Sequence, residues 1–251
     1  MFHGRPGFAR MAAVAVAGAS CLAAVACGTS ASSSSTAPSA SGTADPLASL
    51  TANQVATQAL ANLKAASSLT MAGTAYDSGQ SEVFNLGLKP GQGCAGTMAQ
   101  GSEGSFKLIV IGKTVYFNPS DQFWKSQGGT DASSIIALVN GRYIKTSTSA
   151  SGMSSMTSVC NLSQELASEK VTGTYTKGTL TTLGGIRVLP IVNPKEGVLY
   201  VTDTSKPQVV QIVETKNTGN GTGKLTFSVG APVTLTAPPA SQVIDGSAVG
   251  L

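Results

Sequence analysis

The residues of this chain that could do chemistry are its four cysteines and its single histidine. The histidine, His3, lies in a basic stretch that precedes sixteen small and apolar residues, 11–26. If this part is removed as a signal, the folded part has no histidine. Ser-His-Asp and Cys-His catalysis and the usual zinc sites then lack an essential group. G-x-S-x-G and S-x-x-K motifs are also absent, so the sequence predicts no catalytic residue, no metal and no cofactor.

Cys27 closes the apolar run and is the first candidate for modification. The small residues Ala24, Val25 and Ala26 before it resemble a bacterial lipobox. Sixteen apolar residues are too few for a spanning helix, which needs about 20. Cys21 is a weaker second candidate, because cleavage there leaves a short apolar core. We therefore predict a lipoprotein signal peptide over residues 1–26 and acylation of Cys27, for example with palmitate. An ordinary secretory signal is the alternative.

The stretch after Cys27 consists of Ser, Ala, Thr, Gly and Pro with one charge, Asp45. It has too little apolar surface to offset the entropy of ordering, so we expect residues 27–46 to be a flexible tether. Acyl chains contribute about 0.8 kcal/mol per buried CH₂, and two or three chains hold a protein on a membrane. The prediction is a single domain, 47–251, anchored to the extracytoplasmic face of the cell membrane.

Charge argues against nucleic acid as a partner. The formal net charge is +4, and two of the cations, Arg5 and Arg10, lie in the predicted signal. The remaining Lys and Arg residues are scattered singly rather than in a basic stripe. Twelve acidic residues are spread thinly, so a two-carboxylate hydrolase is only a third hypothesis. We expect a monomer that is not an enzyme.

Two cysteines, Cys94 and Cys160, remain after the anchor. Export permits their oxidation, and we predict a disulfide between them, with two free thiols as the alternative. Such a bond closes a long loop and constrains the unfolded chain by about 4 kcal/mol in the chain-entropy model. Two thiols without a histidine or a third cysteine do not make a metal site.

The elements follow from hydrophobic periodicity. Thr51 and Gln54 form a capping box that opens a helix, Asp131 can cap a short helix that ends at Asn140, and a third helix carries Cys160. Leu108–Ile111 is apolar on both faces, which predicts a strand covered on both sides. Most of the rest alternates as strands joined by tight turns. We predict an α+β fold, a strongly curved antiparallel β-sheet (half-barrel) with about three helices on its concave face.

The order of several short motifs resembles a known family. After the lipobox and the tether come "GCAG", "GKTVYFN", "DQFWKS", "GRYIKTS", "VCNLSQEL", "GVLYVTDTSKPQVVQIV" and "FSVGAPVTLTAPPASQVID". This order resembles the actinobacterial LppX/LprG-type lipoproteins, whose fold is similar to the LolA and LolB carriers, and it covers most of residues 50–246. Tyr143 stands where such families commonly have tryptophan, and paired cysteines occur in a subset of them.

The resemblance implies a half-barrel with an apolar cavity and a lipid or glycolipid as the ligand. Inward-pointing residues are then expected to line the cavity, with plain core packing as the alternative for each. These residues are Leu86, Leu108, Val110, Phe117, Leu138, Leu199, Val201, Ile212 and Phe227. A second hypothesis is a protein-interaction or envelope-sensing module on the same fold, with a filled cavity and an exposed Phe123–Trp124 patch.

Overall fold

The computed structural model describes residues 45–77, 80–127, 129–161, 164, 166, 170–215 and 222–251. The predicted signal peptide, Cys27 and most of the tether lie outside these residues, so the anchor remains a prediction.

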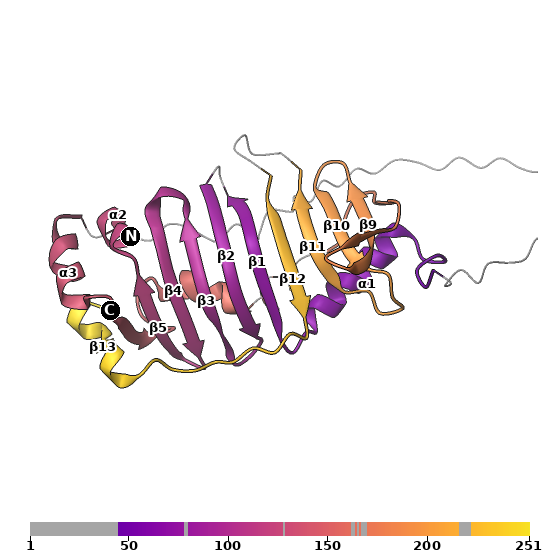
Figure 1. Cartoon of the computed structure of the whole chain (residues 1–251). Helices are drawn as coiled ribbons and strands as arrows, with labels where there is room; N and C mark the ends of the chain where they lie inside the picture. The colour runs from indigo at the N-terminus through magenta and orange to yellow at the C-terminus, as the bar shows by residue number, and fades with distance from the viewer. Residues whose placement is uncertain are drawn as a thin grey trace, which may run out of the picture.

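The described strands form one open, curved sheet (Figure 1). They are β1 (Leu69–Asp77), β2 (Gln80–Lys89), β3 (Gly93–Gln100), β4 (Gly104–Ile111), β5 (Thr114–Pro119), β6 (Tyr143–Ser147), β7 (Thr176–Lys177), β8 (Thr181–Leu183), β9 (Ile186–Asn193), β10 (Gly197–Thr202), β11 (Val209–Glu214), β12 (Lys224–Val229) and β13 (Val243–Asp245). Their order is β13-β6-β5-β4-β3-β2-β1-β12-β11-β10-β9-β7, with β8 also pairing with β9. Two runs of antiparallel strands, β1–β5 and β9–β12, meet where β1 pairs with β12.

One pair departs from the antiparallel prediction. β13 runs parallel to β6, with Ile244 opposite Ile144, so the sheet is mixed. The cause is the connection after β12. Residues 230–239 cross the sheet as an extended strap (Figure 1), and a long crossing of this kind allows a parallel pair that a tight turn does not. β13 thereby covers the exposed edge of β6.

The strap packs on the outer face of the sheet. A Cβ added at Gly87 of β2 would lie 3.0 Å from Cγ1 of Val233. The absence of a side chain at this position therefore gives the strap room to pack on the sheet. Along the strap, Ala231, Val233 and Leu235 are half-buried, while the residues between them are exposed.

Four α-helices occur among the described residues: α1 (Ala52–Lys64), α2 (Asp121–Gln127), α3 (Ala132–Val139) and α4 (Met153–Thr157). The short 3-10 helices are η2 (Gly101–Glu103), η3 (Gly129–Asp131), η4 (Ser158–Asn161), η5 (Ala240–Gln242) and η6 (Gly246–Val249). α1 packs on β7, β9, β10 and β11, and η4, which continues α4, packs on β2 and β3. α2 packs on β4, and α3 packs on α2, while Val139 of α3 belongs to the buried core.

The start of α1 follows the sequence prediction. The Thr51 hydroxyl accepts from the Gln54 amide at 3.2 Å, and the Gln54 side chain accepts from the Thr51 amide at 2.8 Å. This reciprocal box satisfies two N–H groups that the helix itself leaves free. At α3 the prediction holds only in part. Asp131 occupies the cap position without a side-chain hydrogen bond, while Asn140 ends the helix in the left-handed conformation (φ 46°).

The core lies between the sheet and its covering helices. In β2, Phe84, Leu86 and Leu88 are buried, whereas the alternate residue Val83 is 45 % exposed. Leu108 and Val110 of β4 are buried on the same inner face. Their neighbours Ile109 and Ile111 are only half-buried, so the strand is covered fully on one face and partly on the other. The sheet thus has one largely apolar face, which the helices cover.

Candidate functional site

The residues predicted to line an apolar cavity lie, with one exception, at the inner face of the sheet. Six belong to its buried core: Leu86, Leu108, Val110, Phe117, Val201 and Phe227. Leu199 and Ile212 pack against that core while staying half-buried. The structure therefore brings eight of the nine residues to one face. That they line a lipid cavity remains a prediction.

Leu138 is the exception. Its side chain is 46 % exposed on α3, so it does not join the others. The helical period explains the difference. Val139 is buried and Ile135 packs against the core, and Leu138 lies to the side of the stripe that these two residues define. The sequence pattern does not separate Leu138 from Val139, because both are apolar.

The inner face has an accessible apolar part at β10 and β11. Leu199 lies opposite both Ile212 and Ile191 across the ladder. Ile191 is fully buried, yet Leu199 and Ile212 keep part of their surface accessible. Two methionines, Met98 of β3 and Met156 of α4, are also half-buried against the core. Methionine adapts its shape easily, so these two side chains can rearrange around a flexible apolar ligand near β3 and α4.

An aromatic cluster closes the inner face near α2. The rings of Phe106, Phe117 and Phe123 lie with centroids 5.2 to 5.8 Å apart. Trp124 meets Phe123 edge to face at 6.0 Å. Phe123 is buried and Trp124 is half-buried, so this pair packs against the core and does not form the exposed patch of the interaction hypothesis.

The Cys94–Cys160 disulfide is present, as predicted, with the two Cα atoms 5.1 Å apart. It joins η4 to β3 and so fixes the α4–η4 segment over the sheet. Both cysteines belong to the buried core.

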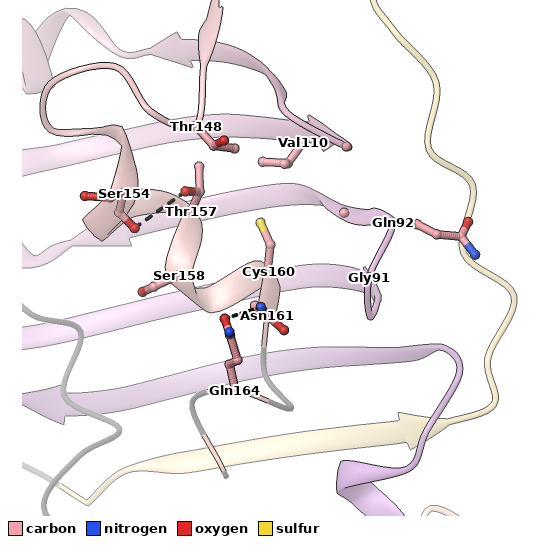
Figure 2. Close-up of a pocket in the computed structure, with 12 residues that line it drawn as sticks. Gly91, Gln92, Val110, Thr148, Ser154, Thr157, Ser158, Cys160, Asn161 and Gln164 are labelled. Carbon is pink, nitrogen blue, oxygen red and sulfur yellow. Dashed lines mark hydrogen bonds between the residues drawn. The ribbon is translucent and has the colours of Figure 1, made fainter. Parts of the chain in front are cut away.

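A pocket of about 440 Å³ lies beside this disulfide (Figure 2). Its lining comes from the β2–β3 and β4–β5 turns, the loop after β6, and the α4–η4 segment. The lining residues are Gly91, Gln92, Gly93, Val110, Gly112, Thr148, Ser154, Thr157, Ser158, Cys160, Asn161 and Gln164. Apart from Val110 and Cys160, sequence reasoning missed this site, because its polar residues come from three separate segments and form no motif.

Charged groups lie outside that pocket. Asp203, in the loop after β10, has a side chain that is 2 % exposed and bonds Nε of Arg187 at 2.8 Å. Burial raises the pKa of the Asp203 carboxyl, the charge of Arg187 opposes this, and the charge and hydrogen bond of Asp45 raise it further. Asp45 is the first described residue, so the contact between Asp45 and Asp203 lies where the predicted tether meets the domain.

The raised pKa of Asp203 predicts a pH dependence of stability. The folded state holds this proton more tightly than the unfolded state does. The resulting stability is therefore complete below about pH 4, the unfolded pKa, and is lost as pH rises through the folded value. Asp45→Asn removes a contribution that raises the pKa of Asp203. The free energy of unfolding, measured with urea, should therefore fall less between about pH 4 and pH 7 in this variant than in the wild type. Asp131→Asn changes an exposed carboxyl and is the control. Equal pH slopes in Asp45→Asn and the wild type would contradict the coupling.

Two further groups are perturbed. The Tyr175 hydroxyl donates to the Glu196 carboxylate, and burial together with Glu196 raises the pKa of Tyr175 to about 12. Burial raises the pKa of the Glu214 carboxyl. Within the described ranges, no group of three or more His, Cys, Asp or Glu side chains is placed to hold a metal ion. None of the described helices has both the length and the apolar character that a membrane span needs.

Known proteins resemble this chain in structure rather than in sequence. No family model matches this chain, and no curated protein matches it. The structure is similar to LprF from Mycobacterium bovis. That match has a TM-score of 0.48 and 15 % identity over 74 % of this chain and 96 % of LprF. An uncharacterized conserved protein from Thermus thermophilus matches with a TM-score of 0.34 and 12 % identity, over 77 % of this chain and 98 % of that one.

Proposed function

We propose that this protein is a membrane-anchored extracytoplasmic lipoprotein that binds and carries a lipid or glycolipid between its curved sheet and the covering helices. The observation that carries the proposal is the apolar inner face, which is continuous over most of the sheet and accessible at Leu199 and Ile212. An acyl chain placed there would remove its own surface and that of these side chains from water, at about 25 cal/mol per Å² of apolar area.

Admission of an acyl chain requires part of the cover to move. The α4–η4 segment is short, spanning Met153–Asn161, and an isolated helix of this length is not stable in water. It is held by its apolar contacts, by the loop from β6 and by the disulfide. Movement of this segment or of α1 would enlarge the accessible space without disturbing the sheet ladder.

Mass spectrometry of organic extracts tests the proposal. The chain would be exported from an actinobacterial host, purified and extracted beside a control exported protein. A diacyl lipid or glycolipid in stoichiometric amount is the expected result and would identify the ligand class. An empty extract, together with no uptake of a fluorescent fatty acid, would overturn the proposal.

One observation favours the alternative, a protein-interaction or envelope-sensing module. Six of the predicted lining residues are at most 5 % exposed, as in a closely packed core. On this alternative the interior is filled, the lipid extract is empty, and binding of a partner protein is lost when a surface patch is changed.

The membrane anchor has its own prediction. Cys27→Ala removes the thiol that would carry the acyl chains, so the protein should move from the membrane fraction to the soluble fraction or the medium. Immunoblotting of fractionated cells measures this, with Cys21→Ala as the matched control that should stay on the membrane. Retention of Cys27→Ala on the membrane would refute the assignment of the anchor.

A further inference from the structure

The pocket beside the disulfide differs in chemistry from the apolar inner face. Of the described residues that line it, four carry hydroxyl groups, three carry amides and none is charged. Its volume, about 440 Å³, falls within the range of small-ligand sites. A bound anion or cation would lose water here without meeting an opposite charge, which is costly. The lining therefore favours a ligand that is polar and uncharged.

The hydrogen-bonding groups of the pocket include both donors and acceptors. The Thr157 hydroxyl donates to the Met153 carbonyl at 2.8 Å, and the Ser158 hydroxyl donates to the Ser155 carbonyl at 3.1 Å. Each of these oxygens keeps lone pairs that can accept. The hydroxyl of Thr148 makes no hydrogen bond to another described residue, so it can donate. Figure 2 shows Thr148 beside Thr157, on the side of the pocket where Val110 lies.

Two features suit the carbon face of a ring. Val110 and Cys160 form an apolar wall, since both belong to the buried core and also line the pocket. At Gly91 and Gly112 an added Cβ would meet no atom within 4 Å, so a ligand can approach the backbone of both turns closely. Sugar rings combine these properties, because their hydroxyls both donate and accept and their C–H faces are apolar.

We propose that this pocket binds an uncharged polyhydroxyl group, that is, one or two neutral sugar rings. The rings can belong to a free saccharide of the cell envelope or to the headgroup of a glycolipid. For a free saccharide the proposal is independent of the proposed lipid function, and for a headgroup it rests on that function.

Saturation-transfer NMR on the purified exported chain tests the site. The probes are neutral oligosaccharides of glucose, galactose, mannose and arabinose, with glucose 6-phosphate as the charged comparison. Transfer to at least one neutral saccharide and not to glucose 6-phosphate is expected. Binding to phosphatidylcholine vesicles that contain digalactosyl diacylglycerol, compared with pure phosphatidylcholine vesicles, forms the second arm. Transfer in the first arm identifies a free saccharide as sufficient, whereas binding in the second arm alone identifies a lipid headgroup. No binding in either arm overturns the proposal.

Three single-residue variants test whether the saccharide binds in this pocket. Ser154 is exposed and lines the pocket, so Ser154→Trp fills the pocket without burying new surface in the core and should abolish binding. Ser151→Trp, an exposed residue outside the lining, is the matched control and should bind normally. Thr148→Val keeps the side-chain shape and should weaken binding about five-fold, the effect of one lost hydrogen bond of about 1 kcal/mol. Binding that Ser154→Trp leaves unchanged would place the ligand elsewhere and overturn the assignment.

Discussion

Reducing the Cys94–Cys160 disulfide is expected to lower the free energy of unfolding by about 4 kcal/mol. The two cysteines are 66 residues apart in the sequence, so the bond closes a long loop in the unfolded chain. In the chain-entropy model, loops of this length give stabilisation of this size.

The position of the bond adds a local effect. Cys94 is fully buried on β3, and Cys160 is the next-to-last residue of the short α4–η4 segment. Without the bond, this segment keeps only its noncovalent contacts, chiefly Met153 and Val159 in the core. We therefore expect reduction to loosen α4–η4 before the sheet unfolds, which would appear as faster hydrogen exchange in residues 153–161 than in β2 or β4.

Urea unfolding with and without dithiothreitol measures the effect. The double variant Cys94→Ala, Cys160→Ala is the control, because its curve should not respond to dithiothreitol. Its stability should lie below that of the reduced wild type by the cost of the removed sulfur atoms in the core. Superimposable curves for the oxidised and reduced wild type would contradict the prediction.

The sequence predicted best those parts of the fold that depend on neighbouring residues alone, such as helix caps and tight turns. Thr51 and Gln54 lie three residues apart, and the cap that they form depends on nothing outside the helix. The antiparallel runs follow tight turns in the same way. β13 was missed because Val243–Asp245 is three residues long and its parallel partner, β6, lies about 100 residues earlier in the chain. The strap, which passes Gly87 of β2, carries the chain from β12 to the edge of β6.

The candidate site was predictable where it depends on strand alternation and not where it depends on tertiary contacts. Alternation placed Leu86, Leu108 and Phe227 on one face, because a strand side chain has only two directions available. In α3 the stripe is wider, and the five adjacent apolar positions 135–139 gave no reason to exclude Leu138. Asp203 gave no signal, since the burial of a loop carboxylate beside Arg187 and Asp45 depends on the folded arrangement of three distant segments.

Filling the accessible part of the inner face should prevent acyl-chain binding. Leu199→Trp places an indole where Leu199 and Ile212 are half-buried and lie opposite each other. Because part of this surface is accessible, the larger side chain should fit at a stability cost within the usual 1–3 kcal/mol for overpacking, about the lower end of that range. Fluorescence titration with a dansylated fatty acid should then show affinity at least about ten-fold weaker, a change of about 1.4 kcal/mol.

Val83→Trp is the matched control for this experiment. Val83 is 45 % exposed on the opposite face of the sheet, so the same side chain there should leave both uptake and the urea midpoint close to wild type. Wild-type affinity in a folded Leu199→Trp protein would exclude the β10–β11 surface from binding. Weaker binding in both variants would show that an added tryptophan acts through stability, which the urea curves would reveal. A loss confined to Leu199→Trp would locate the acyl chain on the inner face, beside the residues that the strand alternation assigns to it.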